Sequence, residues 1–88
     1  MSGECFLCKE WSNALEEHHI FGGALRKKSE KYKLKVNLCH ECHNEPPKGV
    51  HFNRETMQEL HEYGQRKAME ENNWTIEDFR KEFYANYL

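Results

Sequence analysis

The sequence predicts a small α+β domain that a metal ion holds together, with two helices at its C-terminal end. Three observations predict this class. The chain has 88 residues, which is room for one domain. Its four cysteines form two CxxC pairs, at positions 5–8 and 39–42. Short strand-like segments lie between the pairs, and helical periodicity follows them. We expect a single domain over 1–88, with a zinc-stapled core at 4–52 and a helical extension at 53–88.

The two cysteine pairs predict one structural zinc ion. Thiolates three positions apart can both reach one ion, and two such pairs complete the tetrahedral sulfur site that Zn²⁺ favours. The ligands would be Cys5, Cys8, Cys39 and Cys42. Two disulfides or a redox dithiol are the alternatives. Residues 1–20 contain no apolar run typical of a secretory signal, so we favour zinc and an intracellular location.

Composition excludes two classes of protein. The chain is 38% hydrophobic and 32% charged, and no apolar stretch approaches the roughly 20 residues that cross a bilayer. A net charge of −2 argues against a protein that coats nucleic acid non-specifically. Residues 26–35 nevertheless carry a net +5, against −7 for the rest of the chain. This basic strip suits local phosphate contacts, and the alternative is a solvated lysine-rich loop.

The first half of the chain predicts a turn and two strands. Residues 4–12 form a turn around the first cysteine pair, with Phe6 and Trp11 packed beside it. Residues 15–21 form a short strand that leads into a Gly pair, and the basic loop follows. Residues 34–39 alternate apolar and polar positions, which is typical of a second strand. We expect the two strands to pair antiparallel across the long loop.

The second half predicts three helices. A short helix over 39–45 stops before Pro46-Pro47, because the residue before a proline disfavours helical geometry. Asn53 is a suitable N-cap for a helix over 54–71, in which Gly64 indicates close packing. A capping box at Thr75–Asp78 opens the last helix. Its expected apolar face comprises Ile76, Phe79, Phe83 and Tyr87.

Histidines and one asparagine suggest phosphodiester chemistry. Such hydrolysis needs a divalent cation near the phosphate and a base with a pKa near neutrality. His18 and His19 lie on opposite faces of the predicted strand, so one can ligate metal while the other faces substrate. Asn37 could hold an imidazole through its side-chain amide. His43 directly follows the second cysteine pair, and His51 follows the Pro-Pro-Lys-Gly turn.

These residues resemble the HNH motif of the His-Me finger (ββα-metal) endonucleases. The resemblance lies in Glu-Glu-His-His-Ile at 16–20 and in Asn-Leu-Cys-x-x-Cys-His at 37–43. The upstream CxxC is similar to the zinc-stapled branch of that superfamily. The resemblance covers residues 4–52 and does not reach the C-terminal helices. Four segments are also similar to small bacteriophage HNH proteins related to recombination-enhancement nucleases that act on DNA with RecA. They are His-His-Ile-Phe at 18–21, Arg-Lys-Lys-Ser-Glu-Lys-Tyr at 26–32, Cys-x-x-Cys-His at 39–43 and Gly-Val-His-Phe at 49–52.

The resemblance implies a ββα-metal fold and a role for each residue. His19 would be the general base and Asn37 the residue that orients it. His18, His43 and His51 would bind the catalytic cation. Many HNH enzymes carry the last ligand on the helix, whereas His51 follows His43 by eight positions and two prolines. Two other residues are therefore alternatives for the third ligand, namely Asn53 and His61.

The resemblance implies a metal-dependent DNA endonuclease that takes part in phage DNA processing or recombination. Its DNA contacts would come from Arg26, Lys27, Lys28 and Lys31. Its cofactors would be structural Zn²⁺ and a catalytic Mg²⁺ or Mn²⁺, with Zn²⁺ or Ni²⁺ as alternatives. DNA and a recombination or other phage or host protein are the expected partners, in the cytoplasm of a bacterial host. The rival interpretation is a non-catalytic zinc module that binds nucleic acid or protein as an adaptor or inhibitor.

Overall fold

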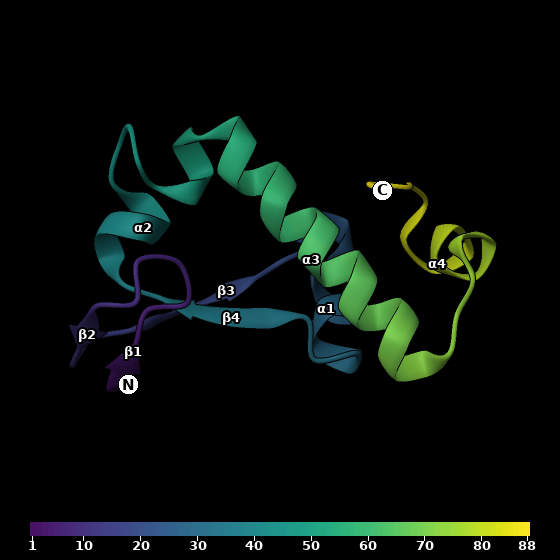
Figure 1. Cartoon of the computed structure of the whole chain (residues 1–88), viewed down its shortest axis with the longest axis horizontal. Helices are drawn as coiled ribbons and strands as arrows, with labels where there is room; N and C mark the ends of the chain where they lie inside the picture. Colours follow the sequence, from purple (N-terminus) through teal and green to yellow (C-terminus); the bar gives the residue numbers. More distant parts are fainter. The chain divides into compact units, whose positions relative to one another are not determined.

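A computed structural model describes residues 1–88. Two short hairpin sheets and four α-helices make up the chain, with two 3₁₀ segments between them (Figure 1). The predicted α+β class is confirmed at this level. In chain order the elements are β1 (Gly3–Glu4), β2 (Trp11–Ser12), β3 (Glu16–His19), η1 (Gly23–Leu25), α1 (Arg26–Lys31), β4 (Lys35–Leu38), α2 (His40–Asn44), η2 (Val50–Phe52), α3 (Arg54–Asn72) and α4 (Ile76–Phe83).

The chain divides into two compact units. Unit 1 comprises Met1–His18 and Lys35–Met57, and unit 2 comprises His19–Leu34 and Gln58–Leu88. The segment between β3 and β4 belongs to the same unit as most of α3 and all of α4. Its apolar residues pack with those helices, as described below.

The first hairpin holds the first cysteine pair. β1 pairs antiparallel with β2, with Gly3 opposite Ser12 and Glu4 opposite Trp11. The expectation that Trp11 packs beside this turn is wrong, because its side chain is 73% exposed. The Phe6 ring instead lies under the Lys9 ammonium, 4.9 Å from ring centroid to Nζ.

The second sheet joins β3 to β4. Leu34, Val36 and Leu38 are buried, as the alternating pattern predicts. The main-chain N–H of Phe6 donates to the carbonyl of Asn37 at 2.9 Å. This bond fixes the first cysteine turn to β4, which leads directly into the second cysteine pair.

The basic segment is a helix, so the expected loop is wrong. η1 and α1 occupy residues 23–31. Ser29 is fully buried, donates through Oγ to the Phe21 carbonyl at 2.7 Å, and accepts from the Phe21 N–H at 3.0 Å. Arg, Lys and Glu favour helix, and this single buried serine anchors the turn to the core. The lysine-rich sequence indicated neither the helix nor the buried serine.

A tight turn connects α2 to η2. The N–H of Gly49 donates to the Glu45 carbonyl at 2.6 Å, and the N–H of Phe52 donates to the Gly49 carbonyl at 2.8 Å. A Cβ atom at Gly49 would lie only 2.7 Å from the Glu45 nitrogen, so this close approach requires glycine. The predicted end of α2 before Pro46-Pro47 is confirmed.

Helix α3 begins and packs as predicted. The side chain of Asn53 accepts from the Thr56 N–H at 3.0 Å, which confirms the N-cap. A Cβ atom at Gly64 would lie 2.8 Å from Ile20 Cγ2 and 2.9 Å from the Phe21 ring. The glycine therefore admits these two side chains close to the helix axis.

Helix α4 begins at the predicted capping box. It ends at Phe83, before the last residue of its expected apolar face. Thr75 and Asp78 exchange both capping hydrogen bonds. Phe79 and Phe83 are buried, whereas Ile76 in the first turn is 40% exposed. Tyr84 has a φ of +62° and ends the helix, so Tyr87 lies beyond it. The Tyr87 ring still joins the unit 2 core, 5.5 Å from the Phe21 ring centroid.

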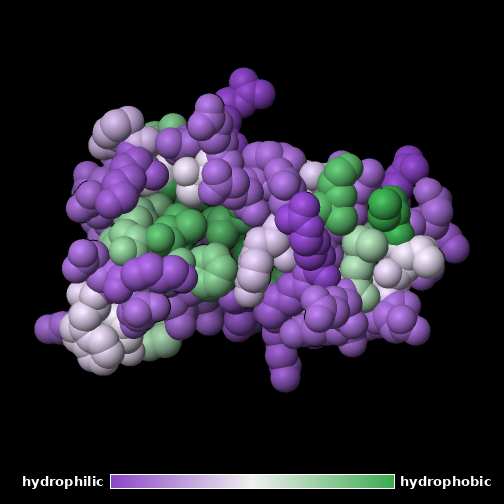
Figure 2. All heavy atoms as spheres, in the orientation of Figure 1, coloured by the Kyte–Doolittle hydropathy of each residue, from purple (hydrophilic) through white to green (hydrophobic).

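Hydrophilic residues (purple) cover most of the face shown in Figure 2, and hydrophobic residues (green) gather between them. None of the helices has the length and apolar character needed to span a bilayer.

Candidate metal centres

Four cysteines of unit 1 converge on one point. The sulfur atoms of Cys5, Cys8, Cys39 and Cys42 all lie within 4.8 Å of one another, and none is in a disulfide. The Sγ atoms of Cys8 and Cys39 are 3.9 Å apart. Four sulfurs at about 2.3 Å from one ion in tetrahedral geometry would be separated by about 3.8 Å. This cluster could hold a structural metal such as zinc.

Local backbone favours ionised sulfur at one of these positions. Burial opposes ionisation of Cys5, but main-chain amides, first that of Cys39, lower its pKa to about 6. Burial raises the pKa of Cys42, and the neighbouring thiols raise it further. Ionisation is thus favoured at Cys5 and opposed at Cys42. A divalent ion would stabilise all four negative sulfurs, which is the chemistry expected of a zinc site.

Three histidines of unit 1 converge on a second point. The nearest nitrogens of His18, His43 and His51 lie within 4.8 Å of one another. Their ring centroids are 4.9 to 5.2 Å apart, and Nε2 of His43 lies 3.1 Å from Nε2 of His51. Two nitrogens at about 2.1 Å from one ion, subtending about 90–110° at it, would be separated by about 3.0–3.4 Å. The donor set fits a divalent cation.

Each histidine comes from a different element. His18 lies on β3 and is buried, His43 lies on α2, and His51 lies on η2 and is exposed. The Gly49 turn returns the chain so that His51 reaches His43. Neighbouring groups remove water from part of the otherwise exposed His51 ring. This desolvation, followed by the nearby His43, lowers the pKa of His51, which favours the neutral imidazole that metals bind. The three residues predicted as ligands are thus brought together.

The two alternatives for the third ligand have other contacts. Asn53 caps α3 through its side chain, as described above. His61 belongs to unit 2, where it stacks on Phe21 at a ring-centroid distance of 5.1 Å and an interplanar angle of 15°. It also lies 4.6 Å from the Tyr87 ring. His61 is therefore partly buried in an aromatic cluster rather than a plain residue of the helix surface.

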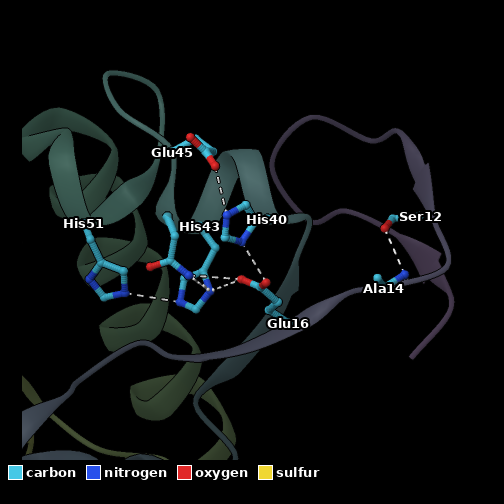
Figure 3. Close-up of polar contacts among 8 residues, drawn as sticks. Ser12, Ala14, Glu16, His40, His43, Glu45 and His51 are labelled. Atoms are coloured by element: carbon cyan, nitrogen blue, oxygen red, sulfur yellow. Dashed lines mark hydrogen bonds and ion pairs between the residues drawn. The ribbon is translucent and has the colours of Figure 1, made fainter.

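A carboxylate that the sequence analysis did not assign lies beside the histidine cluster. Glu16 Oε1 accepts from Nδ1 of His43 at 2.8 Å and from the side-chain amide of Asn44 at 3.0 Å (Figure 3). Its Oε2 accepts from Nδ1 of His40 at 2.9 Å. These contacts, led by His43, lower the pKa of Glu16, so the carboxylate is the ionised acceptor. Asn44 Nδ2 also lies 3.1 Å from His43 Nδ1. The Glu16 carboxylate can accept a hydrogen bond from each of these two nitrogens, so we assign both of them as donors to Glu16.

His40 has a structural contact on each ring nitrogen. Nδ1 faces Glu16, and Nε2 lies 2.9 Å from Oε1 of Glu45 (Figure 3). Glu16 first, and then Glu45, raise the pKa of His40. Its side chain is largely exposed on α2, and it bridges two acidic groups.

His19 and Asn37 are the two residues for which the sequence predicts catalytic roles. In unit 2, Nε2 of the mostly buried His19 lies 3.4 Å from Oε2 of Glu30 on α1. The sequence analysis did not assign Glu30. In unit 1, the main-chain carbonyl of Asn37 accepts a hydrogen bond from the N–H of Phe6 in the first cysteine turn. The roles of His19 as base and of the Asn37 side chain as its orienting group stay predictions.

The four basic residues predicted to contact DNA all lie on α1, with different surroundings. Arg26, Lys27 and Lys31 are exposed. Lys28 donates to the Glu82 carbonyl at 2.6 Å and to its carboxylate at 2.9 Å, on α4 of the same unit. Lys28 is therefore engaged with α4, while the other three are accessible to a phosphate backbone.

No protein-family model, curated protein sequence or solved structure matches this chain.

Proposed function

We propose that this chain is a metal-dependent DNA endonuclease of the HNH type. The observation that supports the proposal is the convergence of His18, His43 and His51 from three separate elements. Three imidazoles on one point, with a carboxylate behind one of them, are typical of a site that holds a divalent cation with room for substrate.

The residues of the chain would divide the reaction between them. The cation, when bound, would neutralise the scissile phosphate and stabilise the leaving oxygen. His19 would take a proton from water, whose oxygen forms the new bond to phosphorus while the phosphodiester P–O bond breaks. Asn37 would orient His19. The exposed α1 residues Arg26, Lys27 and Lys31 would hold neighbouring phosphates.

The donor set bears on the choice of cation. Neutral imidazoles favour Mn²⁺, Zn²⁺ or Ni²⁺ over Mg²⁺, which prefers oxygen ligands. The cluster offers three nitrogens and no carboxylate oxygen. We therefore expect Mn²⁺ or Ni²⁺ to support cleavage at lower concentrations than Mg²⁺.

A nicking assay on supercoiled plasmid tests the proposal. Zinc-loaded protein is incubated with Mn²⁺, Ni²⁺, Mg²⁺ or EDTA, and His19→Ala is compared with wild type at equal zinc content. Cleavage that requires added cation and is lost in the variant would support the endonuclease.

Two results would count against it. Cleavage that survives in His19→Ala would point to a contaminating nuclease or a different base. DNA binding without cleavage under every cation would favour the adaptor module in place of the enzyme.

A further inference from the structure

The carboxylate of Glu16 occupies a central place in the polar network of unit 1. It contacts three side chains of α2, and one of these is the metal-ligand candidate His43 (Figure 3). We propose that Glu16 is a positioning residue that fixes the tautomer and ring orientation of His43, and that His40 clamps Glu16 in place. This inference rests on the proposed function, because it concerns the same site.

The contact with Glu16 selects one tautomer of His43. A neutral imidazole carries one N–H, and an ionised carboxylate can only accept. The 2.8 Å contact therefore places the hydrogen of His43 on Nδ1 and leaves the lone pair on Nε2. Nε2 is the nitrogen that faces His51 at 3.1 Å. The atom that a cation would use is thus the atom that Glu16 makes available.

The side chain of Glu16 is itself held in one orientation. A lone carboxylate on a strand can rotate, but both oxygens of Glu16 have partners on α2. His40 contributes one of them and is held in turn by Glu45 at 2.9 Å. Partners of this kind behind a ligating histidine typically change metal affinity by about 10–100-fold. The network extends from Glu45 through His40 and Glu16 to His43.

The chain offers a matched control next to Glu16. Glu17 is the following residue on β3, and its carboxylate lies 3.3 Å from Nζ of Lys35. Glu16→Gln and Glu17→Gln remove the same charge from adjacent positions. A general attraction between acidic groups and a cation would change equally in both, whereas the positioning role belongs to Glu16 alone.

Mn²⁺ binding to the zinc-loaded protein tests the inference without DNA. Free Mn²⁺ is measured by electron paramagnetic resonance, and histidine tautomers are read from ¹⁵N-labelled protein by NMR. We expect Glu16→Gln to weaken Mn²⁺ binding about 10–100-fold and to remove the single Nδ1–H tautomer of His43. Glu17→Gln should change binding less than about twofold, and His40→Ala should give a smaller loss than Glu16→Gln.

Three results would overturn the inference. They are equal Mn²⁺ affinity in the two glutamine variants, an unchanged His43 tautomer in Glu16→Gln, and no Mn²⁺ binding by wild type. If Glu16→Gln loses zinc or its fold, Mn²⁺ binding by His40→Ala becomes the test, since that variant keeps the Glu16 carboxylate. The wild-type protein could bind Mn²⁺ in a way that depends on Glu16 and still fail to nick DNA. That result would contradict the proposed function and support this inference.

Discussion

The cysteine cluster and the histidine cluster of unit 1 both include residues of helix α2, but they differ in the number of candidate ligands and in exposure. Cys5 and Cys42 are fully buried, and four soft ligands leave no open position. The histidine cluster has three ligands, of which His18 is buried and His51 is exposed. Closed four-ligand sites are typical of structural zinc, whereas three protein ligands with an open side are typical of catalytic sites. The two clusters therefore differ in the two properties, ligand number and exposure, that distinguish structural from catalytic metal sites in general.

Removal of a cysteine should have the largest effect. Cys42→Ser should leave unit 1 unfolded, because the apparent binding free energy of structural zinc, about 10–16 kcal/mol in small zinc domains, is largely folding free energy. Circular dichroism and zinc content by elemental analysis check this. His43→Ala, one residue along, is the matched control and should retain zinc. A Cys42→Ser protein that is folded without zinc would show that the fold does not depend on a metal in the cysteine cluster.

His19→Ala should lower the cleavage rate by about 10²–10⁴-fold while zinc content and melting temperature stay close to wild type, since a general base is worth this much in rate. Single-turnover nicking rates check the first part, and thermal unfolding checks the second. His61→Ala offers a histidine control outside both clusters. A His19 variant that loses its zinc would assign the residue to the structure.

His51→Ala should weaken Mn²⁺ binding by about 100-fold or more, because removal of a direct ligand exceeds the usual effect of its supporting partners. Zinc in the cysteine cluster should be unaffected. The concentration of Mn²⁺ that gives half-maximal cleavage is the measurement, with the exposed neighbour Phe52→Leu as control. If the His51 and Phe52 variants respond alike, the histidine cluster has at most two ligands.

The exposed residues of α1 should govern the salt dependence of DNA binding. Replacing Arg26 and Lys27 by Ala should reduce the slope of log affinity against log salt by about 1.8, or about 0.9 for each phosphate that the protein no longer neutralises. Fluorescence anisotropy at several salt concentrations measures it. Lys48→Ala, which alters a lysine on a different segment, should leave the slope unchanged. An unchanged slope in the double variant would show that these charges are solvated and do not contact phosphates.

His61 should give the smallest effect, through the dependence of stability on pH. Burial lowers the pKa of His61, against an opposing hydrogen bond to the Ile20 carbonyl. The folded state therefore binds this proton less readily than the unfolded chain, whose histidine pKa is about 6.5. The contribution of His61 to stability is complete above that value and declines as pH falls through it. Melting temperatures at pH 7.5 and 5.5 should differ less in His61→Phe than in wild type, and an equal difference would contradict this.

Sequence patterns predicted the features that depend on local spacing. The cysteine pairs, the Asn53 and Thr75 caps and the close packing at Gly64 each depend on residue type at one place in the chain. Glu16 was not predicted because its partners His40 and His43 lie 24 and 27 positions away, and a glutamate on a strand carries no signal by itself.

Two further features were misjudged for physical reasons. The helix α1 was hidden by its charge, since its one buried residue, Ser29, carries no apolar signal. Lys28 appeared equivalent to its neighbours, although Glu82, 54 positions away, engages it. Both depend on contacts between distant segments, which the pattern of one segment does not contain.

At the start of α2, the ligand candidates Cys39, Cys42 and His43 alternate with His40, which holds Glu16, and this limits how the segment can change. Cys39 and Cys42 are three positions apart, as are His40 and His43, so the pairs occupy neighbouring stripes of one helical turn. Inserting or deleting one residue here would rotate everything beyond it by about 100°. Both stripes would lose register together. Natural variants of this segment should therefore differ by substitution and hold its length constant, even where one of the two centres has fallen out of use.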